Sequence, residues 1–223
     1  MKYKSLFKYS EKKYADGLLS WGSVRVGTLY NFREIEHKKG IADPNEGKKV
    51  ISHYIEHWRE NDEVTDQYNM HERSLSQVGG FILEPGGGQQ FHGVTVARQI
   101  EDPDHFIHCT SLNLSEEVMS EFEGANSCVE IFNFRGFYKE LTRSINKQVP
   151  VKFLGLAPVV YRARHEIWNG INQGIPACVI KETHFKMQYE VRAVWAPVNK
   201  EPITPLTFNN IALARFCKRT RLK

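Results

Sequence analysis

The segment KMQYEVRAVWAP, residues 186–197, constrains the fold of this chain more than any other stretch. Polar and apolar residues alternate along it, as they do in a strand that buries one face. Gln188 and Glu190 stand two positions apart, so a strand would place both on one face, with Arg192 next in line. Because Glu is depleted in strands and costly to bury without a partner, this carboxylate indicates either a functional role or an ion pair with Arg192 or Arg33.

Short helices and strands are predicted along the rest of the chain. The predicted helices cover about 11–21, 48–60 and 135–147, with a further helix start at Asn113. The predicted strands cover 3–9, 23–32, parts of 78–111, 127–134, 151–163, 177–183 and 187–196. This order lacks the βαβα rhythm of a doubly wound sheet and predicts an α+β fold whose strands are mostly antiparallel. At 223 residues we expect a single domain, 1–223, with a helical or loop insertion at about 40–105.

Two of these helices are predicted from apolar spacing. In the first, Tyr14, Leu18 and Trp21 would form one buried stripe, and Gly22 would end the helix. In the second, an i, i+3, i+4, i+7 pattern runs from Ile51 to Trp58. Residues 61–77 are polar and show no clear period, so no element is predicted there.

Composition excludes some classes of protein and leaves others open. A hydrophobic fraction of 41% is enough for a core, and a net charge of +4 permits contact with nucleic acid without requiring it. No apolar run approaches the ~20 residues of a membrane span, and the first residues lack the pattern of a signal peptide. The cysteines are scattered without a CxxC pair, which is typical of reduced thiols, so we expect a cytoplasmic protein without a membrane partner.

The string HYIEH, residues 53–57, fits the H-x-x-E-H pattern of a zinc peptidase family. On the predicted helix, His53 and His57 would lie one turn apart and could share a metal. The apolar face of that helix would point well away from both histidines, which favours a solvated helix face over a zinc site. A zinc hydrolase on His53 and His57 is therefore the weaker hypothesis, and no metal is expected.

Three segments, in chain order, resemble the NAD-site segments of ADP-ribosyltransferase folds. LFKYSEKKYADGLLSWGSVRVGTLYNFREIE, residues 6–36, is similar to the opening of the DarT-like nucleic-acid-modifying transferases and of related uncharacterised bacterial families. In those families a strand with a His-Tyr-Thr-like triplet leads to a helix, a Gly and a second strand, and here the triplet is Lys8-Tyr9-Ser10. FIHCTSLN, residues 106–113, resembles the strand that props the NAD ribose, and QYE, residues 188–190, resembles the Gln-x-Glu or Glu-x-Glu strand.

The resemblance implies a split, mostly antiparallel sheet with flanking helices and a site that binds NAD as co-substrate. Glu190 would stabilise the oxocarbenium-like charge on the ribose and hold its 2′-hydroxyl, and Gln188 would orient the acceptor. Ser111 would hold Glu190 or the ribose.

The other implied contacts to NAD come from the first segment. With Tyr9 and Ser10 at the first strand, Tyr9 or Tyr30 would stack on nicotinamide, and Arg25 or Arg33 would bind the pyrophosphate. Each residue also has a structural alternative, in which Ser111 caps a helix and the two tyrosines belong to the core.

The function implied by the resemblance is transfer of a single ADP-ribose from NAD to a macromolecule. The basic tail makes nucleic acid, either RNA or DNA, the expected acceptor. Families with this appearance often act as bacterial toxins or antiviral defence effectors, so a protein antitoxin or inhibitor is a possible partner. The alternative from another class is an inactive member of the fold that binds nucleic acid or protein, which would tolerate any residue at Lys8 and Tyr9.

Overall fold

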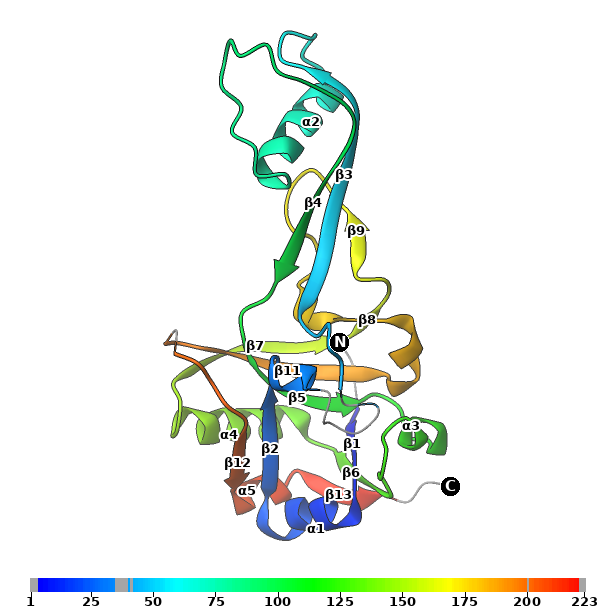
Figure 1. Cartoon of the computed structure of the whole chain (residues 1–223). Coiled ribbons are helices and arrows are strands. Elements are labelled where there is room, and N and C mark those ends of the chain that lie inside the picture. The colour runs from blue at the N-terminus through cyan, green and yellow to red at the C-terminus, as the bar shows by residue number, and fades with distance from the viewer. Residues whose placement is uncertain (1–3, 35–39, 41, 200, 221–223) are drawn as a thin grey trace. The chain divides into compact units, whose positions relative to one another are not determined.

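The computed structural model describes residues 4–34, 40, 42–199 and 201–220. The chain forms two compact units (Figure 1). Unit 1 comprises residues 1–46, 103–162 and 179–223, and unit 2 comprises residues 47–102 and 163–178. Both contain helices and strands, so the α+β class is confirmed, and most strand pairings among the described residues are antiparallel.

Unit 1 is built on an antiparallel sheet with the strand order β12-β2-β5-β1-β6-β13, to which β11 and β7 are added beside β5. The strands are β1 (Leu6–Ser10), β2 (Ser23–Thr28), β5 (Phe106–Ser111), β6 (Ser127–Ile131), β7 (Val151–Pro158), β11 (Glu190–Pro197), β12 (Leu206–Asn209) and β13 (Cys217–Thr220). A small parallel pair, β8 (Val160–Tyr161) and β10 (Ile180–Lys181), completes the strands of this unit.

The sheet of unit 1 is split along one edge of β5. β11 pairs with the whole length of β5 and therefore occupies one edge of β5. On the other edge β2 pairs with Phe106 and Ile107, whereas β1 pairs at Ser111. Residues 108–110 lie between these two pairings, so β1 and β2 diverge from each other there.

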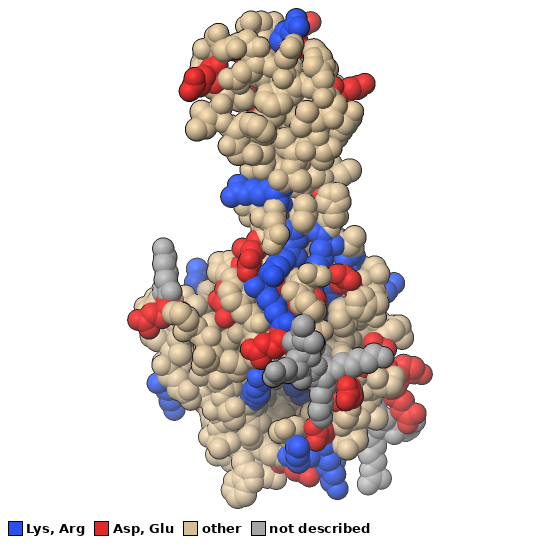
Figure 2. Space-filling view, viewed as in Figure 1, with Lys and Arg blue, Asp and Glu red and all other residues tan. Residues whose placement is uncertain are grey.

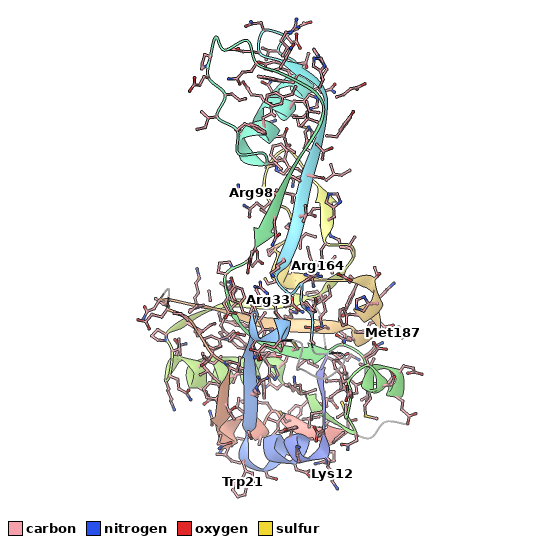
Figure 3. All side chains as sticks on the ribbon, in the orientation of Figure 1. Lys12, Trp21, Arg33, Arg98, Arg164 and Met187 are labelled. Atoms are coloured by element: carbon pink, nitrogen blue, oxygen red, sulfur yellow. The ribbon has the colours of Figure 1, made fainter. Side chains whose placement is uncertain are left out.

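The helices of unit 1 are α1 (Lys12–Trp21), α3 (Glu116–Ser120), α4 (Phe134–Asn146) and α5 (Ile211–Ala214), with short 3₁₀ turns η1 (Asn31–Arg33), η2 (Ala177–Val179, at the border of the units) and η3 (Thr183–Gln188). Apolar side chains of α1 and α4 pack against the sheet to form its main core. Gly22 ends α1 in the left-handed conformation, as predicted. The predicted stripe is wrong in part, because Leu18 is buried but Tyr14 and Trp21 are 60% and 70% exposed. Figure 3 marks Trp21 at the end of α1.

Unit 2 consists of a long antiparallel pair, β3 (Lys48–Arg59) and β4 (Gln90–Glu101), with α2 (Asp66–Gln77) and the short β9 (His165–Ile167) beside β3. Its core includes Ile51, Ile55, Trp58, Leu75 and Trp168. The buried ammonium of Lys49 donates to Glu166 and to the carbonyls of Gln173 and Ile175. These bonds attach the segment 163–178 to β3.

The helix predicted over 48–60 is wrong, because these residues form the strand β3. Ile51, Ile55 and Trp58 are buried, and the distances between them in the sequence match the spacing of a helix by coincidence. Several residues on both faces of the first half of β3 are buried, so polar and apolar residues do not alternate there as in a half-buried strand. The β-branched residues Val50, Ile51 and Ile55 were the signal for a strand.

The helix α2 was not predicted, because its buried face includes polar residues. His71 and Ser74 are buried beside Leu75, so the apolar period is weak. Its start carries a recognisable signal, since the hydroxyl oxygen of Thr65 accepts a hydrogen bond from the backbone N–H of Tyr68. An acidic residue in the first turn, Asp66, is also typical of a helix start.

A buried histidine pair joins β3 to α2. His53 Nε2 lies 2.9 Å from His71 Nδ1, and the His53 ring meets the edge of Trp168. Burial lowers the pKa of both histidines; the charge of His71 lowers that of His53 further, whereas Glu56 acts to raise that of His71.

The histidine pair is expected to make unit 2 less stable in acid. The unfolded chain takes up protons near a pKa of about 6.5, while the folded pair resists them, so stability falls as the pH drops below about 6.5 and is fully present above it. The intrinsic exchange rate of amides itself falls between pH 7.5 and pH 5.5, so after correction for it the protection of the α2 amides should decrease over this range. In a His71→Gln variant this acid-specific opening should be reduced, and an unchanged opening would contradict the assignment to this pair.

None of the helices in the described part of the chain combines the length and the apolar character needed to cross a membrane.

Candidate active site

The strand β11 begins at Glu190 and not, as predicted, near residue 187. Gln188 is the last residue of η3, and Tyr189 follows with a φ of 45°, in the left-handed region that non-Gly residues rarely adopt. The prediction that Gln188 and Glu190 share one face of a strand is therefore wrong. The turn at Tyr189 nevertheless directs both side chains to one partner, the ammonium of Lys181.

Lys181, at the end of β10, lies between these two side chains. Its Nζ donates to Gln188 Oε1 at 2.9 Å and to Glu190 Oε2 at 2.7 Å. The amide of Gln188 donates in turn to the backbone carbonyl of Gly40 at 2.9 Å. The backbone N–H of Glu190 donates to the hydroxyl oxygen of Tyr161 at 2.7 Å, which fixes the first residue of β11.

Glu190 also belongs to a chain of buried ion pairs. Arg192 Nε donates to Glu190 Oε1 at 2.7 Å, and the two terminal guanidinium nitrogens bind both oxygens of Glu46 at 2.7 and 2.8 Å. Glu46, Lys181, Glu190 and Arg192 are each no more than 4% exposed. Two acidic and two basic side chains therefore balance one another, and we call these four residues the charge cluster.

The charge cluster keeps Glu190 ionised. Burial by itself would raise the pKa of Glu190, but the charges of Arg192 and Lys181 and their hydrogen bonds outweigh it and hold the pKa well below its usual range. For Arg192, burial acts to lower the pKa, and Glu190 and Glu46 raise it well above its ordinary value. A carboxylate with fixed charge and orientation is what stabilisation of a developing positive charge requires.

Lys8 of β1 occupies the split in the sheet. Its Nζ donates to the backbone carbonyl of Cys109 at 2.8 Å, at the part of β5 where neither β1 nor β2 pairs. Burial lowers the pKa of Lys8, and the nearby Cys109 and Glu190 act in the opposite direction. Burial also raises the pKa of the Cys109 thiol to about 12, so this cysteine is held in its neutral form.

Ser111 lies directly opposite Glu190 in the sheet. The two residues are direct partners across β5 and β11, and Ser111 is also the partner of Phe7 on β1. Its hydroxyl oxygen accepts a hydrogen bond from the backbone N–H of Asn113 at 3.2 Å. Ser111 thus stabilises the turn after β5 and does not cap α3, which is capped by Ser115.

Tyr9 and Ser10 are placed differently from their predicted roles. Tyr9 is buried and stacks on Phe122, and its hydroxyl donates to the carbonyl of Asn113 and accepts from the backbone N–H of Ser115. Its ring is thus fully engaged in the packing around α3, as in the structural alternative. Ser10 is the last residue of β1 and pairs with Ser127 in β6.

Arg25 within β2 and Tyr30 just after it are exposed, whereas Arg33 in η1 is half-buried. The exposed Arg25 donates to the side-chain oxygen of Asn31 at 2.8 Å. The guanidinium of Arg33 lies 4.0 Å from the centre of the Tyr30 ring, and its Nε donates to the backbone carbonyl of Glu46 at 2.7 Å. Arg33 is therefore connected to the charge cluster through the backbone of Glu46.

Two members of the charge cluster, Glu46 and Lys181, were not predicted from the sequence. Glu46 belongs to the string DPNEG, residues 43–47, whose turn composition was the available signal. Within it, the N–H of Glu46 donates to the carbonyl of Asp43, a turn that directs the Glu46 side chain to Arg192. Lys181 carries no local signal, because only the fold brings it to Glu190.

The helical geometry proposed for a zinc site on His53 and His57 is absent, because both residues lie in the strand β3. His53 is buried against His71, whereas His57 is exposed and contacts His92 and Asp62. Among the described residues no group of three or more His, Cys, Asp or Glu side chains is arranged to hold a metal ion.

Comparison of the chain with protein-family models, with curated proteins and with solved structures gives no match.

Proposed function

We propose that the chain transfers ADP-ribose from NAD to a macromolecular acceptor, with Glu190 as the catalytic carboxylate. The observation that carries the proposal is the adjacency of β1, β5 and β11. Each strand carries part of one of the three segments whose sequences resemble an NAD site, and the strands are neighbours in one sheet, with Ser111 directly opposite Glu190. That segments separated by about 80 residues or more meet in one sheet supports the proposal.

The chemistry fits the residues that are present. The reaction breaks the bond between the ribose C1 and the nicotinamide nitrogen, forms a bond from C1 to the acceptor and releases nicotinamide and a proton. Positive charge builds on the ribose before the new bond is complete. The fixed negative charge of Glu190 would stabilise it, and Lys181 and Arg192 keep the carboxylate ionised and oriented.

The split edge supplies cationic groups for the phosphates of NAD. Lys8 lies in the split, and Arg25 is close enough to act on its pKa. Arg33 donates to the backbone carbonyl of Glu46, a member of the charge cluster. We assign Lys8, Arg25 and Arg33 to the pyrophosphate. At the first-strand position, where the two main transferase classes carry His or Arg, this chain has Lys8 or Tyr9 instead.

The charge distribution favours unit 1 for contact with a nucleic-acid acceptor. Unit 2 contains six Lys and Arg and ten Asp and Glu residues, a net charge of −4, which leaves +8 for unit 1. A polyanion would be attracted to unit 1 and repelled by unit 2. RNA or DNA is therefore the acceptor class that we propose for unit 1.

Release of nicotinamide tests the donor independently of the acceptor. We expect the purified chain, incubated with NAD, to release nicotinamide that is detected by chromatography. Release should increase when the correct acceptor pool is added. If NAD is neither bound in a thermal-shift titration nor consumed with any acceptor pool, the proposal is wrong.

A second function, binding without catalysis, is favoured by one feature of the site. Both oxygens of Glu190 are already engaged by buried cations, and the residue is only 4% exposed. A domain of this kind would act by binding a partner, and unit 2 offers a surface for it. Its exposed apolar residues include Ile82, Ile167 and Ile171, at 78–85% exposure, and one face of unit 2 carries few charged side chains (Figure 2).

The composition of this surface favours a protein over a nucleic acid as partner of unit 2. Under this alternative NAD would not be consumed. Replacement of Ile82 and Ile171 by Ser would abolish partner binding, whereas replacement of Glu190 by Gln would leave it intact. Under the transferase proposal, replacement of Glu190 by Gln would stop NAD consumption, whereas replacement of Ile82 and Ile171 by Ser would leave it intact.

A further inference from the structure

Two exposed histidines face each other across the strands of unit 2. His57 of β3 and His92 of β4 are direct partners in the antiparallel register. Their Nδ1 atoms lie 3.0 Å apart, and the His57 side chain is 49% exposed, so solvent reaches the pair. Neither histidine takes part in the charge cluster of unit 1.

The second ring nitrogen of His57 is bound to a carboxylate. Its Nε2 lies 3.0 Å from an oxygen of Asp62. A carboxylate accepts a proton and cannot donate one when ionised, so Nε2 of a neutral His57 carries the hydrogen. The lone pair of His57 then lies on Nδ1 and points toward His92. A carboxylate that orients a histidine in this way is the usual second layer of a metal site.

We propose that His57 and His92 bind a divalent transition-metal ion through their Nδ1 atoms, with Asp62 as the positioning residue and water completing the coordination. With metal–nitrogen bonds of about 2.05 Å, a nitrogen separation of 3.0 Å corresponds to an angle of about 94° at the metal. This angle matches the tetragonal geometry of Cu²⁺ or Ni²⁺ better than the tetrahedral geometry of Zn²⁺. The net charge of −4 on unit 2 also attracts a cation.

Titration with Cu²⁺ tests the proposal in the full chain without an affinity tag. We expect one ion per chain and an electron paramagnetic resonance spectrum of a tetragonal site with two nitrogen ligands. His92→Ala should lower the affinity at least tenfold and leave one nitrogen ligand. Asp62→Asn should lower the affinity by about 10–100-fold while keeping both nitrogens. His184→Ala, which removes an exposed histidine of unit 1, is the matched control and should have no effect.

Circular dichroism checks that each variant is folded, and His92→Gln serves as a second variant if His92→Ala is not. The proposal is overturned if the wild-type chain binds no Cu²⁺, which would leave a histidine–histidine hydrogen bond only. It is equally overturned if His92→Ala binds as tightly as the wild type, or if His184→Ala loses affinity to the same degree.

Discussion

Replacement of Glu190 by Gln is expected to lower the rate of ADP-ribose transfer by on the order of a hundredfold or more. Gln keeps the size of the side chain and removes its negative charge, so the developing charge on the ribose loses its partner. The measurement is the rate of nicotinamide release at saturating NAD, per folded molecule. Release at the wild-type rate would remove Glu190 from the mechanism.

Loss of activity in this variant could also follow from loss of structure, since Glu190 binds both Lys181 and Arg192. Glu46→Gln is the matched control, because Glu46 is an equally buried carboxylate bound to the same Arg192. We expect it to lower stability while the remaining folded molecules stay active. If the two variants lose activity equally at equal folded fractions, the role of Glu190 is structural.

Replacement of Arg192 by Met is expected to destabilise the chain by about 3–5 kcal/mol, the usual cost of removing one partner from buried charges. Arg192 is 1% exposed and connects Glu190 to Glu46. Without it, Glu46 loses its two-bond partner and Glu190 retains Lys181. Urea unfolding followed by circular dichroism measures the change in the free energy of unfolding.

A double variant separates the lost ion pair from the lost packing. Arg192→Met combined with Glu46→Gln removes one charge of each sign, so it should recover part of the stability lost in Arg192→Met alone. The losses of the two single variants would simply add if the charges were not coupled. Strict additivity would thus contradict the charge cluster as an energetic unit.

The sequence identified the strands of the candidate site well, because their patterns are local. β5 and β11 contain alternating or continuous apolar runs, and α1 ends at a glycine in the left-handed conformation. The sequence also indicated that Glu190 needs either a functional role or an ion pair. The ion pair with Arg192 is present, and the functional role stays a prediction.

What the sequence could not show is the set of partners brought in from elsewhere in the chain. Lys181 comes from a two-residue strand and Glu46 from a turn. Neither segment is long enough to show a periodic sequence pattern that would indicate the role of the residue. The turn at Tyr189 was missed because its left-handed backbone is rare outside glycine. In unit 2, polar residues on the buried face of α2 hid the helix, and burial on both faces disguised β3.

Transfer of label from NAD tests the central claim most directly. NAD labelled in the adenylate phosphate is incubated with the wild-type chain, Glu190→Gln and Glu46→Gln, each with separate pools of DNA, RNA and cell protein. We predict that the label enters one acceptor pool with the wild type and with Glu46→Gln, and enters none with Glu190→Gln. Absence of label from every pool with the wild type, or undiminished labelling with Glu190→Gln, would contradict the claim.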